Sequence, residues 1–229
     1  MSVSIINTIK TIDEYLKQNI PFSFRVLKKY VFFDKDGAPY LALLKKLPVS
    51  KYDDYDLDFA DQGYQIFVYP FSHVKNGLRK KFVASAIICV SANEARIIGQ
   101  EIIYLSRIWI ADQDYKQKGI GSNLLKIIDL FAVNEKKDFV CGYFAPFGFM
   151  SGNLKQVKKF YNKSFYKVLN DKESARKPFS YDLVKEVLGA KSTKLVTINF
   201  PTKKFDFTVI VPKEQIFSSS YRGMTEDKN

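Results

Sequence analysis

Histidine and cysteine, which supply the ligands of most zinc sites, are nearly missing from this chain of 229 residues. His73 is the only histidine, and the two cysteines, Cys89 and Cys141, stand in separate apolar runs without a Cys-x-x-Cys pair. No residue cluster therefore indicates a zinc site, and no metal is expected. The cysteines are typical of buried free thiols in a reducing compartment. A Gly-x-Ser-x-Gly elbow is also missing, so nothing supports a serine hydrolase of that type.

Long hydrophobic runs are missing as well. No uninterrupted apolar run approaches the ~18 residues that a membrane-spanning helix needs. The first residues, 1–4, lack the basic segment and long apolar stretch that begin a signal peptide. We therefore expect a cytoplasmic protein with no membrane partner.

Acidic residues are in the minority: 24 Asp and Glu stand against 36 Lys and Arg, which gives a formal net charge of +12. Such a charge suits nucleic acid, an anionic membrane or a phosphate-rich cofactor, although it also serves solubility alone. Apolar residues are plentiful, at 46% of the chain, and 20 Phe and 14 Tyr favour a sheet-rich core. Disorder is excluded on the same grounds.

Hydrophobic periodicity predicts how strands and helices alternate along the chain. The helices are expected over residues 4–18, after the glycines at 119–121, and from 154 onward. The predicted strands cover 23–33, 39–46, 64–70, 81–90, 101–110, 138–144 and 179–185, with a hairpin of 195–200 and 205–211 at the end. The order strand, helix, strand, helix predicts an α/β or α+β layered fold.

An acidic run, residues 53–61, resembles a calcium loop only superficially. Counted from Asp54, the sixth position is Phe59 rather than Gly, and the twelfth is Gln65 rather than Glu. An exposed acidic loop is one interpretation of this run. Attraction of a cationic molecule is the other.

The segment Lys116-Gln117-Lys118-Gly119-Ile120-Gly121-Ser122 lies between a predicted strand and a predicted helix. Glycines let backbone N–H groups approach an anion, and the helix adds its positive N-terminal end. The segment is neither a Walker loop, since Gly-Lys-Ser/Thr is missing, nor a dinucleotide fingerprint, since position 124 is Leu124. By itself it predicts a pyrophosphate site or a tight turn without ligand.

Two stretches resemble the GNAT superfamily of N-acetyltransferases. Residues 105–125 are similar to its coenzyme A motif Arg/Gln-x-x-Gly-x-Gly/Ala, with Lys116 in place of Arg or Gln. Residues 157–166 are similar to its signature Ala-x-x-Phe-Tyr-x-Lys-x-Gly-Phe, with Phe165 in place of Gly. The resemblance covers about residues 80–185. Residues 106–110 are also similar to the central strand of the cohesion-establishment lysine acetyltransferases, whose zinc finger this sequence lacks.

The resemblance implies a GNAT-like α/β (α+β) fold, with a mixed central sheet flanked by helices and a C-terminal β-hairpin extension. We expect an acetyltransferase domain over residues 1–189, with its core at about 80–185, and an extension over 190–229. The implied activity is transfer of an acetyl group from acetyl-CoA, as co-substrate, to a primary amine by direct attack. The acceptor is open, with a protein lysine or a small amine as candidates.

The resemblance also implies which residues bind and react. The backbone of the central strand, near Ile108–Ile110, would stabilise the oxyanion, and Tyr161 would protonate the leaving thiolate, unless it only packs on its helix. The implied coenzyme-binding residues are Ile108, Trp109, Ile110, Lys116, Gln117, Lys118, Gly119, Ile120, Gly121, Ser122, Asn153 and Tyr161. Asn153 is equally suited to capping a helix.

A general base must deprotonate the amine, and Glu101 at the start of the central strand is the first candidate. Asp112 and Asp114 are the others. The alternative function is a basic GNAT-fold protein that binds or modifies nucleic acid, motivated by the net charge and by the lysines at 155, 158, 159 and 163. A homodimer is also among the expected assemblies.

Overall fold

The computed structural model describes residues 26–55, 57, 60–75, 82–90, 102–111, 113–144, 154–174, 177–187, 195–200 and 207–212. The helix predicted over residues 4–18 and residues 56, 58 and 59 of the acidic run lie outside this part of the chain. None of the described helices is long and apolar enough to cross a membrane.

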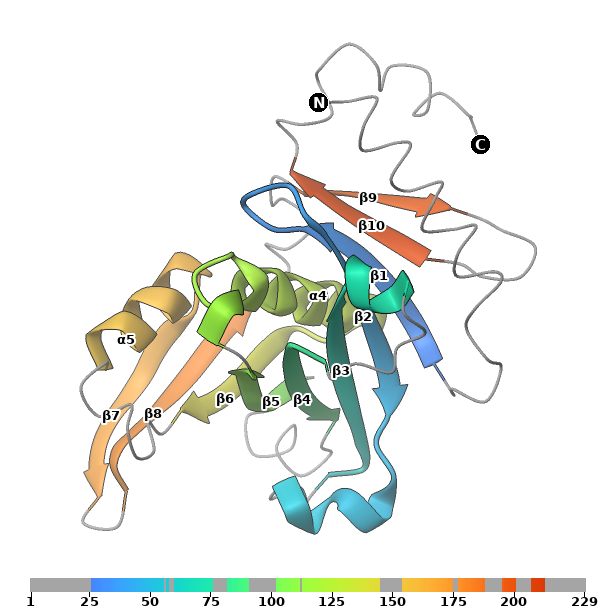
Figure 1. Cartoon of the computed structure of the whole chain (residues 1–229). Coiled ribbons are helices and arrows are strands. Elements are labelled where there is room, and N and C mark those ends of the chain that lie inside the picture. The colour runs from blue at the N-terminus through green and yellow to red at the C-terminus, as the bar shows by residue number, and fades with distance from the viewer. Residues whose placement is uncertain are drawn as a thin grey trace.

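A single mixed sheet of ten strands forms the framework (Figure 1). Its spatial order is β7-β8-β6-β5-β4-β3-β2-β1-β10-β9, and the pairs β5–β6 and β1–β10 are parallel while the other neighbours are antiparallel. The strands are β1 (Val26–Phe33), β2 (Pro39–Lys46), β3 (Gln62–Pro70), β4 (Ala84–Val90), β5 (Ile102–Ile110), β6 (Phe139–Phe144), β7 (Lys167–Ser174), β8 (Lys177–Glu186), β9 (Leu195–Phe200) and β10 (Phe207–Pro212).

In the described part of the chain, three α-helices and three short 3₁₀ turns connect these strands. The helices are α2 (Phe71–Lys75), α4 (Ile120–Asn134) and α5 (Leu154–Lys163), and the turns are η1 (Val49–Lys51), η2 (Asp53–Tyr55) and η3 (Gln113–Tyr115). In Figure 1, α4 crosses the middle of the sheet and α5 lies beside it, near β7 and β8. Because α4 links two parallel strands, it forms the crossover of a β–α–β unit.

The core follows from the alternation of side chains along the strands. On one face of the sheet, residues such as Ala42, Ile66 and Ala86 pack against the apolar stripe of α4, including Leu124 and Ile128, all fully buried. On the other face, Ile87 and Cys89 pack under the segment between β2 and β3, with Leu47, Tyr52 and Leu57. The sheet is therefore covered on both faces at its centre.

The predicted fold class is confirmed: the sheet is mixed, helices flank it, and the last two described strands, β9 and β10, pair as an antiparallel hairpin. Three features were not predicted. The short helix α2 follows β3 directly. β7, whose sequence is rich in polar residues, forms the edge strand beside β8. The C-terminal hairpin also joins the main sheet, since β10 pairs in parallel with β1 through Tyr30↔Thr208 to Phe32↔Ile210.

Candidate functional site

The glycine-containing loop bends sharply into α4. Gln117 and Gly119 both have positive φ, 63° and 85°, and Gly119 is the N-cap residue of the helix. Only glycine adopts such a left-handed conformation without strain, which explains why Gly119 stands there. Gly119 provides no side-chain cap, and the first turn of α4 holds no acidic residue.

This helix end is therefore suited to an anion. The N–H groups of a first helical turn lack intrahelical acceptors, and the helix dipole adds positive potential at the same place. Lys116 is exposed and Lys118 is half-buried, with its Nζ 5.5 Å from the ring centroid of Tyr115. Two ammonium groups and a bare helix end thus occur within one short loop.

The turn between β1 and β2 supports this loop from outside. The N–H of Lys35 donates a hydrogen bond to the carbonyl oxygen of Lys118 (3.2 Å), and Nδ2 of Asn123 donates to the carbonyl of Phe33 (3.2 Å). The side chain of Lys35 also covers Gly119: its Cγ lies 3.5 Å from the position that a Cβ of Gly119 would take. A third lysine therefore belongs to the loop region, which local sequence patterns could not indicate.

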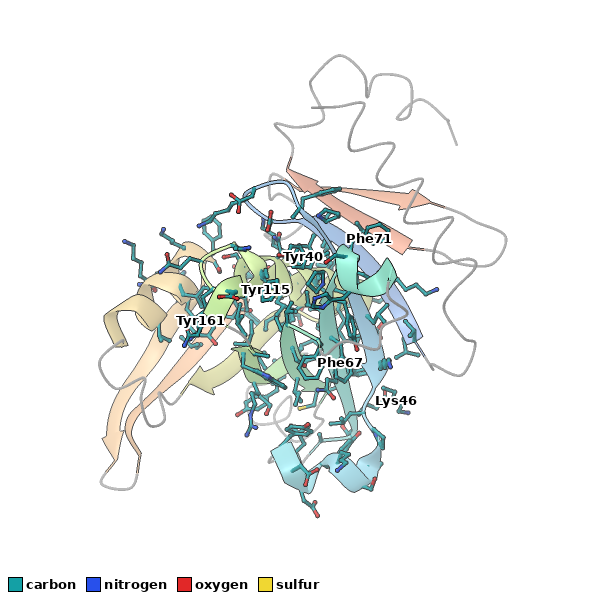
Figure 2. All side chains as sticks on the ribbon, viewed as in Figure 1. Tyr40, Lys46, Phe67, Phe71, Tyr115 and Tyr161 are labelled. Carbon is teal, nitrogen blue, oxygen red and sulfur yellow. The ribbon has the colours of Figure 1, made fainter. Side chains whose placement is uncertain are left out.

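Asp34 organises that turn. Its Oδ1 accepts hydrogen bonds from the N–H groups of Asp36 (2.9 Å) and Ala38 (2.8 Å), and its Oδ2 accepts one from the hydroxyl of Tyr40 (3.2 Å). Burial, followed by the neighbouring Asp34 carboxylate, raises the pKa of Tyr40 well above its usual value. The Tyr40 ring meets Tyr115 edge-on at 6.4 Å, as Figure 2 lets the reader follow, so the turn and the loop share an aromatic contact.

The central strand β5 carries a β-bulge in its pairing with β4. In its pairing with β4, Ile87 faces Arg107 and Ile88 faces Leu105, so Ser106 is the extra residue. A bulge turns backbone groups out of the regular ladder. The oxyanion donors are expected near Ile108–Ile110, a few residues beyond this irregularity, whose only sequence signal is the polar pair Ser106-Arg107 inside an apolar run.

The strands β5 and β6 pair over a short distance only. Among the described residues, their ladder joins Ile102–Tyr104 to Phe139–Cys141, although β5 continues to Ile110. At the end of this ladder Gly142 approaches β5 so closely that a Cβ would lie 2.6 Å from the carbonyl oxygen of Leu105. Backbone groups of β5 beyond Leu105 are thus not engaged by β6.

Tyr161 projects from α5 into the core and is 6% exposed (Figure 2). Burial raises the pKa of its hydroxyl well above the usual value, so the phenol stays protonated at neutral pH. The neighbouring residue Phe160 packs on the first turn of α4, where a Cβ on Gly121 would lie 3.1 Å from its ring. This contact brings α5, and with it Tyr161, against the glycine-containing loop, and it accounts for the second glycine of the motif.

The segment before β3 lies on the other side of the bulge. The hydroxyl of Ser106 donates to the carbonyl of Tyr55 (3.1 Å), and the Arg107 guanidinium lies 5.5 Å from the centroid of the Tyr55 ring. Asp53, Asp54 and Asp61 are exposed, and Asp54 pairs with Lys51 at 2.9 Å. An acidic surface therefore borders the bulge, as far as the described residues show.

The remaining sequence candidates are placed as follows. Glu101, Asp112 and Asn153 lie outside the described residues, and Asp114 is exposed in η3. Ile108 and Ile110 pack on the α4 side of the sheet, whereas Trp109 points to the other side and meets Phe82 edge-on at 6.2 Å. Within the described part of the chain, no three His, Cys, Asp or Glu side chains gather into a group that could hold a metal.

Comparison with known proteins gave matches among solved structures. No family model and no curated protein matches the chain. The GNAT domain of S. lividans PAT is similar with 14% identity over 69% of this chain and 96% of that one, at a TM-score of 0.43. An IAA acetyltransferase from Bacillus cereus is 12% identical over 63% of this chain and 99% of its own, at 0.42. A Bacillus subtilis acetyltransferase in complex with CoA is 10% identical over 60% and 83%, at 0.39.

Proposed function

We propose that this chain is an acyl-coenzyme A-dependent N-acyltransferase that transfers an acetyl group from acetyl-CoA to a primary amine. The observation that carries the proposal is the contact between α5 and the glycine-containing loop, because Phe160 packs on Gly121 and Tyr161 is the next residue. Two further features support it: the bare N-terminus of α4, and the bulged part of β5 that the described part of β6 leaves unpaired.

The phosphates of the coenzyme would occupy the loop. Backbone N–H groups from Gly119 to Ser122 would donate to the pyrophosphate, as at other helix N-termini that bind anions. Lys116 and Lys118, together with Lys35 from the β1–β2 turn, would supply positive charge. Because Lys35 lies outside the part of the chain that resembles GNAT proteins, its contribution is proposed from the geometry alone.

The acyl group would reach β5. The backbone from Ser106 to Ile110 pairs with β4 along one edge, and the described part of β6 leaves its other edge open. That open edge would offer N–H groups to the pantetheine arm and to the thioester carbonyl, with the bulge at Ser106 as the oxyanion site. The amine nitrogen would attack the carbonyl carbon, the carbon–sulfur bond would break, and the sulfur would leave as a thiolate. Tyr161, which stays protonated, would donate a hydrogen bond to that sulfur.

The acceptor amine would approach from the side of Tyr55 and Arg107. Exposed carboxylates at Asp53, Asp54 and Asp61 give that side a negative surface, which favours a cationic amine such as a lysine side chain or a polyamine. The proton lost by the amine requires a base, for which Glu101, Asp112 and Asp114 are the candidates.

Calorimetry and a thiol-release assay test the proposal. We expect acetyl-CoA to bind with an affinity that falls as salt rises, because phosphate contacts are screened. We expect free CoA to accumulate when polyamines, lysine peptides or peptides with a free N-terminus are supplied. Acetyl-CoA that neither binds nor is consumed with any of these amines would contradict the proposed activity.

A second candidate function, nucleic-acid binding, is favoured by one feature of α5. Residues 154–170 contain five lysines and no Asp or Glu. Lys159, Lys163 and Lys167 are exposed, and beside them Phe165 is 74% exposed with a positive φ of 65°. An exposed aromatic ring among lysines is suited to stacking on a single-stranded base.

The variant Phe165→Gly tests this second function, because glycine relieves the left-handed strain while removing the ring. If the surface binds single-stranded nucleic acid, the variant should keep or gain thermal stability and lose affinity for a labelled oligonucleotide. Val49→Ser is a matched control, since Val49 is equally exposed at 74%. Unchanged oligonucleotide affinity in Phe165→Gly would exclude this surface.

A further inference from the structure

A buried ion pair lies behind Tyr161. Lys185 on β8 donates to Oδ2 of Asp129 on α4, and the two side chains are only 8% and 5% exposed. Removing two charges from water is expensive, so apolar residues of similar size would often stabilise the same position as well or better. The pair is therefore not explained by stability alone.

Tyr166 completes the group. The Nζ of Lys185 lies 5.5 Å from the centroid of the Tyr166 ring, and Tyr166 is 3% exposed. The hydroxyl of Tyr166 and Oδ1 of Asp129 are both buried, and neither forms a hydrogen bond with the described residues. Buried polar atoms without a partner are rare in folded proteins. We call Asp129, Tyr166 and Lys185 the buried polar cluster.

The buried polar cluster touches Tyr161 through Tyr166. The two rings meet edge-on, with centroids 5.5 Å apart and an interplanar angle of 73°. The N–H of Tyr166 also donates to the carbonyl oxygen of Tyr161 at 3.1 Å. Tyr161 is thus held on one side by Tyr166 and on the other by its edge-on contact with Phe160, which packs on Gly121.

The cluster links the elements that must be aligned at the proposed active site. Asp129 belongs to α4, whose first turn faces the coenzyme phosphates, and Tyr166 follows α5, which carries Tyr161. Lys185 sits on β8 opposite Val140 of β6, the strand from which β5 separates. A displacement of one member would therefore change the distance between the coenzyme helix and the Tyr161 hydroxyl.

We infer that the buried polar cluster positions the Tyr161 hydroxyl at the leaving sulfur of the acyl donor. Asp129, Tyr166 and Lys185 act through Tyr161 and do not touch the substrate, so they are positioning residues. This inference rests on the proposed acyltransferase function and adds to it a set of residues that the sequence motifs do not contain.

Two variants change the cluster without leaving a buried charge alone. Asp129→Leu combined with Lys185→Met replaces the ion pair with apolar side chains, and Tyr166→Phe removes one hydroxyl. The matched control is Tyr30→Phe, because Tyr30 is 1% exposed and its buried hydroxyl likewise finds no hydrogen-bond partner among the residues that the structure describes. Tyr30 lies on β1, and in the sheet the strands β6, β5, β4, β3 and β2 separate β1 from β8, which carries Lys185.

We expect the double variant to lower kcat about tenfold or more, because small displacements of a reacting group reduce turnover strongly. Tyr166→Phe should lower kcat less. The Kd for acetyl-CoA should stay within about twofold of the wild-type value in both, since the loop contacts are unchanged. Tyr30→Phe should leave both constants unaltered.

A double-mutant cycle separates positioning from general damage. In a Tyr161→Phe background the cluster replacement should have almost no further effect on kcat, because residues that act as a unit are not additive. An equal loss in both backgrounds, or an unchanged kcat in the wild-type background, would overturn the inference. If Tyr161→Phe itself keeps full turnover, the role of Tyr161 in the proposed function fails, and the cluster inference fails with it.

A spectroscopic measurement tests the inference without turnover. Fluorotyrosine incorporated into the folded protein gives a ¹⁹F resonance for each tyrosine, and the signal of Tyr161 is assigned by its loss in Tyr161→Phe. The signal should shift in the Asp129→Leu/Lys185→Met variant and in Tyr166→Phe, but not in Tyr30→Phe. An unmoved Tyr161 signal in a folded double variant would overturn the positioning role, whether or not acetyl-CoA is turned over.

Discussion

Lys35 lies over Gly119, with its Cγ and Cε 3.5 and 3.8 Å from where a Cβ of Gly119 would stand. Gly119 has a φ of 85°, which costs other residues about 1–2 kcal/mol. Gly119→Ala should therefore lower the free energy of unfolding by about that amount, as measured by denaturant titration. It should also weaken acetyl-CoA binding, because relief of the left-handed strain at residue 119 would shift the backbone N–H groups of the loop.

Gly37→Ala is the control for the Gly119 prediction. Gly37 has a similar φ of 81°, and nothing lies within 4 Å of its added Cβ. The Gly37→Ala protein should lose a similar amount of stability because of the strain. Its affinity for acetyl-CoA should fall less than that of Gly119→Ala. A Gly119→Ala protein as stable as the wild type would contradict the left-handed conformation at that residue.

Lys35→Gln tests whether the β1–β2 turn contributes charge to the coenzyme site. Exposed charge pairs are worth about 0.2–1 kcal/mol, so the Kd for acetyl-CoA should rise by up to about fivefold at low salt. The difference should shrink at high salt. Acetyl-pantetheine, which carries no phosphate, should bind the variant and the wild type equally.

Lys46→Gln is the matched control, since Lys46 is exposed at the opposite end of β2 from the turn (Figure 2). Its coenzyme affinity should equal that of the wild type. If Lys35→Gln behaves like Lys46→Gln, Lys35 supports the loop through its backbone and stem only.

The sequence predicted the elements that depend on neighbouring residues, but not the contacts between distant parts of the chain. Local patterns predicted β1 and β2 with their turn, the apolar strand β5, the helix after Gly119 and the final hairpin, because periodicity and turn residues act over a few positions. The contact of Lys35 with Gly119 and the pairing of β10 with β1 join residues far apart in the chain. No local pattern encodes such contacts.

The polar strand and the bulge were missed for a different reason. β7 reads Lys-Val-Leu-Asn-Asp-Lys-Glu-Ser, and an edge strand does not require the apolar alternation of a central one. The bulge at Ser106 depends on how β5 pairs with β4, which a single strand sequence does not specify. For the same reason the position of the proposed oxyanion site could be predicted only to within a few residues.

Tyr161→Phe should lower kcat at least tenfold and change the Kd for acetyl-CoA by less than about twofold. The hydroxyl contacts only the departing sulfur in the proposed reaction, so binding does not depend on it. Because burial raises the pKa of Tyr161, its protonation should add no limb to the pH–rate profile between about pH 6 and 10. Stopped-flow and steady-state thiol-release assays measure these quantities, and an unchanged kcat would remove Tyr161 from the mechanism.

Asp129 should make the stability of the protein depend on pH in an unusual direction. Burial raises its pKa from 3.8 to about 6, although the ammonium of Lys185 acts in the opposite direction. Tyr166 is a further titratable group that interacts with Asp129, and Tyr166 in turn interacts with Tyr161 and Cys141. Between these two pKa values, Asp129 holds a proton in the folded state that it releases in the unfolded state. Its contribution to the free energy of unfolding is therefore complete below about pH 4 and is lost as pH rises through 6.

The Asp129→Asn variant isolates this contribution, because its amide does not titrate. The free energy of unfolding of wild type minus that of the variant should fall by on the order of 2–3 kcal/mol between pH 4 and 7, at about 1.4 kcal/mol per pKa unit. Urea unfolding at several pH values measures this difference. The exposed Asp54→Asn, which breaks the surface pair with Lys51, should change stability by no more than about 1 kcal/mol across the same range. A wild-type-minus-Asp129→Asn difference that instead grows with pH would mean that Lys185 holds Asp129 ionised, with its pKa below that of the unfolded chain.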